Sequence, residues 1–495
     1  MICMFSAIVT SVLPAKAARH LTRAALIAVS VLSAVLLINL HGSGESFAYM
    51  MGHFPAPWGN EIRAGELEAL MALFISIVAL FSVMAGMPAV LKDIEDDKQN
   101  LYFILVDLMT ASIISMIYTN DLFTGYVFIE INTIAGCGLI MIRQIGKSIV
   151  TSMRYMIISL VGSGLFLVGL TMLYTISGHL LMPNIRERIS QLAGDDKYSV
   201  TLTVVVGLIT VGLAIKSGLF PFHLWIPDAY GYSNVASSSL LSSIVSKGYI
   251  LLLIKIFYRV IGIDIIVKSG VHNILFAFGV TAMIMGSVEA IREKNIRRMI
   301  AFSSVAQIGY IYMGLGLGTA AGTVAALFHI ISHGSTKSLL FLTSAEFTEG
   351  SHTKNFSELY GTGRKYRGSA LCYSIGAFSM VGFPLLAGFI SKLMFATAAV
   401  GGFRVKMFIA LFALAVSTIL NTIYFLKSVI VIYSTNPVEN TDDTGDTYLG
   451  GKGGTLASKI QYFGSIAALT VINFLFGIKA QAIIDIISEG LKVFD

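Results

Sequence analysis

The chain has 495 residues, of which 55% are hydrophobic and only 13% are charged, and its formal net charge is +6. A soluble fold needs about 25% charged residues to cover its surface, so lipid must be the main solvent of this chain, whose mean hydropathy is +0.79. This composition excludes a secreted disulfide scaffold, a nucleic-acid-binding protein and a disordered protein. Cys3, Cys137 and Cys372 lie far apart within apolar runs and give neither a metal-ligand spacing nor a disulfide framework.

Apolar runs recur along the whole chain, and most are long enough to cross a hydrocarbon core of about 30 Å as a helix. They predict an all-α integral membrane protein with about fourteen transmembrane helices. The expected spans are 2–14, 24–40, 69–90, 101–119, 122–142, 155–175, 199–219, 235–257, 273–291, 299–317, 322–346, 369–400, 406–434 and 460–483.

The basic residues predict the orientation of the chain. Lys16, Arg19 and Arg23 follow the first apolar run and none precedes it, so we expect a retained helix with its N-terminus outside rather than a signal peptide. Alternation from that start places the most basic loops in the cytoplasm. These loops and the helix ends beside them carry Arg143, Lys147, Arg154, Arg292, Lys294, Arg297, Arg298, Lys354, Arg364, Lys365 and Arg367.

Two connections are long and polar. The outer segment Glu45–Leu67 is expected to form an ordered interfacial turn from Pro55, Pro57, Trp58 and Gly59. The stretch 436–459 is Gly-rich and is expected to be a flexible cytoplasmic loop, and its GGKGG lacks the spacing of a phosphate-binding loop. The glycines of 314–318 indicate close helix packing rather than a dinucleotide site.

Prolines interrupt two apolar runs at membrane depth. Pro221 and Pro384 each deprive a helix of a backbone hydrogen bond, so both helices should break. Lys216 precedes its proline by five residues, whereas Lys392 follows its own by eight. This opposite order is typical of two halves related by inverted topology; two unrelated kinks are the alternative.

Several ionisable residues lie inside the apolar runs, where a charge costs several kcal/mol. Glu130, Lys247 and Lys337 lie too deep to reach an interface, so we favour a function for them over a fixed ion pair or a structural hydrogen bond. Lys216 and Lys392 lie beside the two breaks, where unpaired backbone groups hold water.

His329, His333 and Lys337 recur at every fourth residue, which places three protonatable groups on one helix face over about 12 Å. This pattern indicates a proton-conducting stripe, and a packing role for the histidines is the plain alternative. Metal ligation by the histidines lacks an evident third ligand. Because we find no nucleophile triad and no cofactor motif, we expect a carrier without a catalytic centre or a cofactor of its own, driven from elsewhere.

At these residues the sequence resembles a known family. The run KSGLFPFHLWIPDA at 216–229 is similar to the signature of the antiporter-like subunits of respiratory complex I, Mrp-type sodium/proton antiporters and membrane-bound hydrogenases. Further motifs with this resemblance are 128–130, 296–310, 328–337 and 382–392. The resemblance covers roughly residues 70–430.

The resemblance implies two inverted five-helix repeats, at 101–260 and 270–434, around a hydrated polar axis. Three helices in 1–100 precede them, and a polar loop with a C-terminal helix in 435–495 follows. The implied roles are an ion pair of Glu130 with Lys216, a continuation through Lys247, a link through His329, His333 and Lys337, and terminal proton exchange at Lys392.

The resemblance also bears on the kind of subunit. Lysine at position 392 argues against the complex I paralogue that carries glutamate there, and the chain ends soon after its last span, without the long lateral helix of the largest paralogue. The segment 49–59 resembles the D subunit of Mrp antiporters and related hydrogenase subunits. The residues Gly334, Ser335 and Thr336 depart from the apolar residues that are usual in the family between His333 and Lys337.

We therefore expect a proton-translocating subunit, with or without exchange for sodium, of a multi-subunit Mrp-type antiporter or of an Mrp-related respiratory complex such as a membrane-bound hydrogenase, in a prokaryotic cell membrane. The expected partners are other membrane subunits and the lipid bilayer, and no nucleic acid. The alternatives are a complex I-type NADH–quinone oxidoreductase pumping subunit, a structural subunit without transport of its own, and a stand-alone carrier for an organic solute.

Overall fold

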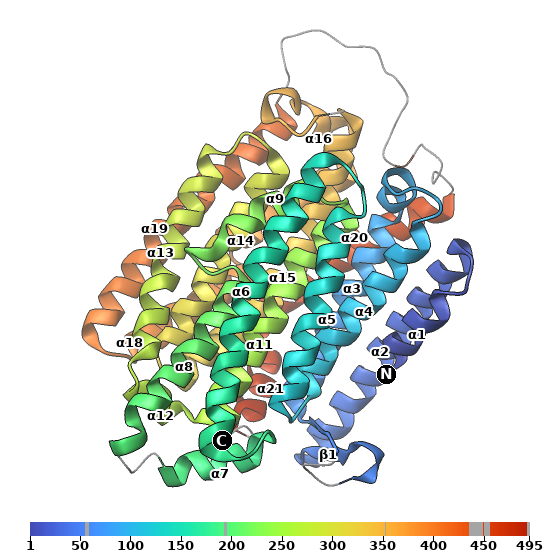
Figure 1. Ribbon diagram of the computed structural model, residues 1–495. Helices are drawn as coiled ribbons and strands as arrows, with labels where there is room; N and C mark the ends of the chain where they lie inside the picture. Colours follow the sequence, from blue (N-terminus) through green and yellow to red (C-terminus); the bar gives the residue numbers. More distant parts are fainter. Residues whose placement is uncertain (55–58, 193–195, 352, 435–448, 450–455, 493–495) are drawn as a thin grey trace.

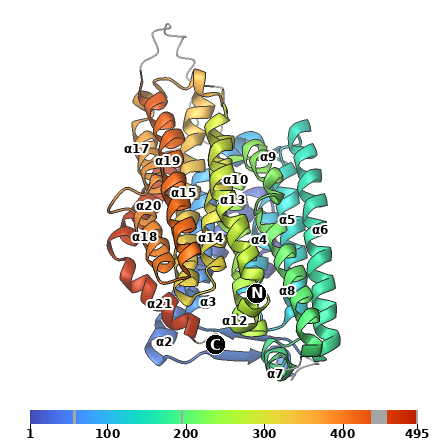
Figure 2. The same cartoon turned by 90° about the vertical axis from the view of Figure 1, so that its left-hand side faces the viewer.

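The computed structural model describes residues 1–495 except 55–58, 193–195, 352, 435–448, 450–455 and 493–495. Long helices run side by side and form one bundle (Figures 1 and 2). Within the described ranges, 11 helices are long and apolar enough to cross a membrane. The chain is therefore a multi-pass, all-α membrane protein, as the composition predicts.

The helices before the first break are α1 (Ile2–Thr10), α2 (Ala15–Ser43), α3 (Glu66–Asp93), α4 (Gln99–Tyr118), α5 (Leu122–Met141), α6 (Gly146–Ser177), α7 (Met182–Leu192) and α8 (Asp196–Ser217). Next come α9 (Trp225–Tyr232), α10 (Val235–Leu240), α11 (Ser246–Ile256), α12 (Ile263–Lys268), α13 (Val271–Arg292), α14 (Ile296–Gly316) and α15 (Ala320–Gly350). The last are α16 (Thr362–Lys365), α17 (Arg367–Val381), α18 (Ala387–Val400), α19 (Arg404–Tyr433), α20 (Leu456–Ile478) and α21 (Ala480–Lys492).

Every expected span coincides with a helix or with a broken pair of helices. Three of the expected spans are not among the 11 helices that are long and apolar enough to cross a membrane, and they correspond to α1, α15 and the α17–α18 pair. With nine residues, α1 is only roughly 14 Å long and does not cross the bilayer by itself. In contrast, α15 has 31 residues and is long enough, but its polar side chains lower its hydropathy.

Both expected breaks are present. The first lies between α8 and α9 and contains Pro221, and the second lies between α17 and α18 and contains Pro384. Gly218 and Gly382 end the first half of each broken helix with φ of 77° and 96°, a left-handed conformation that glycine adopts without a steric cost. Each break thus exposes backbone groups that an unbroken helix would pair internally.

Close helix contacts depend on glycine, as expected for a membrane bundle. A Cβ on Gly309 of α14 would lie 2.6 Å from the carbonyl oxygen of Gly279 on α13. Within the glycine-rich run 314–318, a Cβ on Gly314 would lie 2.5 Å from the Phe395 ring, and one on Gly316 would lie 2.4 Å from the Phe276 backbone nitrogen. This confirms the packing interpretation of that run.

The two ends of the bundle differ in composition. One end, here called the basic end, collects the basic loops, and its ion pairs join Arg143 to Asp93 at 3.2 Å and Arg154 to Asp228 at 3.4 Å. The other end, the hairpin end, carries the antiparallel strands β1 (Phe47–Met50) and β2 (Glu61–Ala64) (Figure 1).

Parts of the two polar connections fall outside the described residues. These parts are Pro55, Pro57 and Trp58 of the expected outer turn, and all of the stretch 436–459 except Leu449 and the four residues from 456 onward. The described part of the outer connection contains the short hairpin, which the sequence pattern did not predict.

The expected last span, 460–483, is too long at its C-terminal end. α20 ends at Ile478, and the separate helix α21 packs against α3 and α15 at the hairpin end. α21 is amphipathic, with Ile487 and Leu491 buried and Asp485 and Glu489 exposed. Its polar face explains why it does not continue the membrane span.

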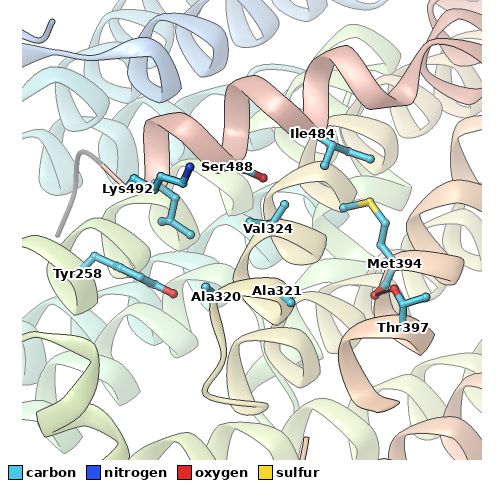
Figure 3. Close-up of a pocket in the computed structure, with 10 residues that line it drawn as sticks. Tyr258, Ala320, Ala321, Val324, Met394, Thr397, Ile484, Ser488 and Lys492 are labelled. Atoms are coloured by element: carbon cyan, nitrogen blue, oxygen red, sulfur yellow. Dashed lines mark hydrogen bonds between the residues drawn. The ribbon is translucent and has the colours of Figure 1, made fainter. Parts of the chain in front are cut away.

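α21 lies over a cavity at this end (Figure 3), and the volume of this cavity is about 460 Å³. The lining comes from α15, α18, α21 and Tyr258, whose hydroxyl donates a hydrogen bond of 2.8 Å to Thr323. Most of the lining is apolar, including Val324, Met394 and Ile484, and it includes none of the seven site residues predicted from the sequence. We therefore assign this cavity no part in the ion path.

Candidate functional site

A row of ionisable side chains crosses the inside of the bundle. The structure places the predicted residues on five helices: Glu130 on α5, Lys216 on α8, Lys247 on α11, His329, His333 and Lys337 on α15, and Lys392 on α18. Four of the seven are at most 1% exposed: Lys216, Lys247, His333 and Lys337. The helices that carry them come from both halves of the chain.

The row begins with an ion pair. Lys216 Nζ lies 3.9 Å from Glu130 Oε1 and donates a hydrogen bond of 2.7 Å to Thr133 Oγ1, one helical turn further along α5. The Tyr249 ring lies 5.6 Å from the same ammonium group. The Lys216 side chain is 1% exposed, whereas that of Glu130 is 25% exposed. The ammonium group therefore has two alternative acceptors, of which only the carboxylate is charged.

Lys247 follows on α11, next to an irregular turn. A π-helical turn, Leu241–Val245, separates α10 from α11, and Lys247 Nζ donates to the carbonyl oxygen of Ser242 within it. Such wide turns occur often at functional sites. The fully buried Lys247 has no carboxylate within ion-pair distance among the described residues. A charge at this position therefore depends on backbone dipoles or on water.

The α15 stripe continues the row. The His329 and His333 rings are stacked, with centroids 5.6 Å apart and planes 7° from parallel. Lys337 Nζ donates 2.7 Å to the carbonyl oxygen of Ile300 and also bonds the Ser303 hydroxyl, both on α14. Both ring nitrogens of His333 are buried without a hydrogen-bond partner in the described residues. Buried polar groups in this state are the usual sites of ordered water.

At the far end the stripe reaches Lys392. His329 Nδ1 lies 2.6 Å from the hydroxyl of Ser391, the residue before Lys392. Lys392 Nζ donates 2.7 Å to the carbonyl oxygen of Val381 and 3.1 Å to Thr418 Oγ1. Val381 is the last residue of α17. The helix break therefore supplies the acceptor for this lysine, because the carbonyls of a helix end have no partner within the helix.

One of the buried acids that sequence reasoning missed is Asp107 on α4. It is 0% exposed and accepts hydrogen bonds from Ser6 on α1 at 2.6 Å and from Thr22 on α2 at 3.0 Å. The criterion that identified Glu130, a carboxylate inside an apolar run, applies equally to Asp107. In the structure, Asp107 connects α1 and α2 to α4 through these two hydrogen bonds.

A second missed group lies at the hairpin end. Glu68 of α3 lies 3.7 Å from Lys255 and 3.6 Å from Arg259, and all three side chains are nearly fully buried. Lys255 Nζ also donates 2.5 Å to the carbonyl oxygen of Ile117. Lys255 could have been identified from the sequence, because it is a charged residue inside the apolar run 235–257. Glu68 could not be identified in this way, because it precedes the expected start of its span at residue 69.

No group of three or more His, Cys, Asp or Glu side chains in the described part of the chain is placed to hold a metal ion. The site therefore offers proton-accepting groups, hydroxyls and carbonyl oxygens inside a membrane bundle with two broken helices. Buried ionisable residues in this setting mark ion or proton pathways. Fold and site thus define a class: multi-pass membrane proteins with an internal path for an ion.

Comparisons with known proteins specify the family. The profile described as "NADH:quinone oxidoreductase/Mrp antiporter, TM" matches residues 119–421, which is more than half of the chain. The chain belongs to this family. It is 30% identical to NADH-quinone oxidoreductase subunit N of Desulforudis audaxviator over 83% of this chain and 80% of that protein.

Other relatives come from a different type of assembly. The chain is 24% identical to the D subunit of the Na⁺/H⁺ antiporter of Alkalihalophilus pseudofirmus over 86% of this chain and 83% of that protein. Its fold matches a chain of the Mrp complex from Dietzia with a TM-score of 0.85 and 21% identity, covering 99% of this chain and 96% of that one. The family is thus shared by antiporters and by respiratory enzymes.

Proposed function

We propose that this chain is an ion-translocating subunit of a multi-subunit Mrp-type antiporter or of an Mrp-related respiratory complex in a prokaryotic cell membrane. The observation that carries the proposal is the buried row from Glu130 to Lys392, which joins both halves of the bundle. The alternative of a complex I-type pumping subunit uses the same row and is supported by the relative named subunit N.

In this proposal Lys216 is the switch at the start of the row. When its ammonium group pairs with Glu130 it holds its proton, because an opposite charge nearby favours the charged form. Thr133, at 2.7 Å, offers a neutral acceptor to the same nitrogen. A change in the distance or hydration of the ion pair therefore decides whether Lys216 holds the proton or passes it toward Lys247.

The middle of the row works by repulsion between like charges. Lys247 and Lys337 both act electrostatically on His333, and charges of the same sign repel strongly in a medium of low dielectric constant. A proton that arrives at one lysine therefore favours departure from the next. The stacked histidines and the water that their free nitrogens require provide the relay to Lys392.

The driving force comes from elsewhere in the assembly in this proposal. The chain is expected to hold no cofactor, so its partners supply either an ion gradient or a redox reaction. Sodium exchange is part of the proposal, and the similarity to the D subunit of a Na⁺/H⁺ antiporter supports it.

The test is proton uptake by everted membrane vesicles that contain the whole complex. We expect Lys247→Met and Glu130→Gln to abolish uptake while the amount of assembled complex stays at the wild-type level. Lys147→Met serves as the control, because Lys147 is exposed at the start of α6 and away from the row. Normal uptake in both variants contradicts the proposal, and loss of the assembled complex in both favours a structural subunit instead.

A second experiment identifies the driver. The complex is extracted in mild detergent, and its other subunits are identified by mass spectrometry. Partners with iron–sulfur or nickel–iron centres indicate the pump module of a redox complex, whereas small membrane subunits alone indicate a secondary antiporter.

A further inference from the structure

A second cavity, with one polar wall, lies at the basic end of the bundle, away from the row. Its volume is about 650 Å³, and it is bounded by the starts of α2, α4 and α20 and by the last turns of α3. One wall is basic and consists of Lys16, Arg19, His20 and Arg23. Because Arg19 and His20 lie three and four residues after Lys16, and Arg23 lies four and three residues after them, these side chains share one face of α2.

The positive charge of this wall has no ion-pair partner among the described residues. Within the described residues, none of the ion pairs includes Lys16, Arg19 or Arg23. The Nε atoms of Arg19 and Arg23 are buried and have no hydrogen-bond partner there. The carboxylate in the lining, Asp96, accepts a hydrogen bond of 2.9 Å from Gln99. Among the described lining residues, the positive charges of Lys16, Arg19 and Arg23 therefore face the one carboxylate of Asp96.

The opposite wall is apolar. Met87, Pro88 and Leu91 of α3 and Phe103 of α4 line it. The apolar run of α2 begins directly after Arg23, so the basic wall lies where the hydrocarbon core meets the lipid headgroups. A ligand that fits both walls has a negatively charged head and an apolar tail, and it lies at the membrane surface.

We propose that this cavity binds an acidic phospholipid, with the phosphate group held by Arg19 and Arg23 and an acyl chain along Met87, Leu91 and Phe103. Arginine suits this role because its guanidinium group donates two parallel hydrogen bonds to a phosphate. Basic pockets between membrane helices on the cytoplasmic side are known to bind such headgroups. The bound lipid lies between α2, α3 and α4, next to the start of α20, which also lines the cavity.

Free phosphate shares the headgroup chemistry, and the experiment separates the two sources. The purified, delipidated complex is incubated with phosphatidylglycerol, with phosphatidylcholine or with inorganic phosphate, and the bound molecules are counted by native mass spectrometry. We expect retention of phosphatidylglycerol and not of phosphatidylcholine, with no displacement by millimolar phosphate. Equal retention of both lipids, binding of phosphate alone, or no bound lipid in the wild-type complex overturns the proposal.

Variants test the assigned residues. Arg19→Gln with Arg23→Gln should lower phosphatidylglycerol retention by about tenfold or more, because both charge-assisted contacts are lost. Arg292→Gln with Lys294→Gln is the matched control, since it removes two exposed positive charges from the same end of the bundle. If the first pair does not assemble, Arg19→Lys with Arg23→Lys keeps the charge and removes the bidentate geometry, and partial loss is expected. Wild-type retention in every variant contradicts the assignment.

Discussion

The hydroxyl group of Thr133 gives a sharp test of the ion pair at the start of the row. It accepts the 2.7 Å hydrogen bond from Lys216 Nζ and donates 2.9 Å to the carbonyl oxygen of Ile129. Thr133→Val removes the acceptor and preserves the shape of the side chain. A hydrogen bond to a charged group contributes roughly 1.5–3 kcal/mol, and each 1.4 kcal/mol is a factor of ten in population.

We therefore expect proton uptake by vesicles that contain Thr133→Val to fall by roughly tenfold or more, since the proposed cycle requires Lys216 to return to this acceptor. Thr133→Ser, which keeps the hydroxyl, should restore most of the rate. Thr210→Val is the matched control, because Thr210 is 2% exposed on α8 and its hydroxyl has no hydrogen-bond partner in the described residues. An unchanged rate in Thr133→Val, or an equal loss in the control, refutes the role given to Lys216.

Three further predictions concern stability, measured as thermal unfolding of the detergent-solubilised protein. Asp107→Ala leaves the hydroxyls of Ser6 and Thr22 unpaired and should cost about 1–3 kcal/mol, and Asp107→Asn should cost less. Gly309→Ala should cost about 1–3 kcal/mol by overpacking, whereas Gly207→Ala, whose Cβ meets nothing within 4 Å, should not destabilise. Burial, with Arg297 and Arg143 nearby, lowers the pKa of the loop residue Lys354 to about 7. Above that pH the unfolded chain binds more protons than the folded chain, so the free energy of unfolding should rise from about pH 7 to 10. Lys354→Met should remove this rise.

The sequence predicts the membrane-spanning fold well, because the length of an apolar run is set directly by the thickness of the bilayer. The two breaks were predictable for a similar reason, since Pro221 and Pro384 cannot be accommodated without loss of a backbone hydrogen bond. The short hairpin and α21 were missed because they lie outside the hydrocarbon and their apolar residues form no continuous run.

The site was predictable as a set of residues but not as a set of contacts. Buried charges stand out within apolar runs, which is why Glu130 and Lys247 were found and why Asp107 was also within reach. The hydrogen-bond acceptors of the buried lysines could not be identified in this way. Lys247, Lys337 and Lys392 all bond carbonyl oxygens of the backbone, and which carbonyl is free depends on where a helix widens or ends and on which helix packs beside it.

The helix that carries Lys247 also allows a comparison of the lysine that we propose to conduct protons with a lysine that has a fixed counter-charge. Lys247 and Lys255 are eight residues apart on α11, and both are buried. Lys255 lies 3.7 Å from the Glu68 carboxylate and shares it with Arg259. Within the described part of the chain, Lys247 instead bonds the carbonyl oxygen of Ser242 and has no carboxylate within ion-pair distance. A lysine with a fixed counter-charge keeps its proton, and one without it can release the proton.

The two lysines should therefore respond differently to the same substitution. Lys247→Met should stop proton uptake and leave the complex intact. Lys255→Met should lower the thermal stability of the complex, and Glu68→Gln should lower it further, by about 3–5 kcal/mol, because two positive charges then lack their carboxylate. If Lys255→Met instead stops uptake without any loss of stability, the Glu68 group is part of the ion path, and the path extends from Lys247 to the hairpin end.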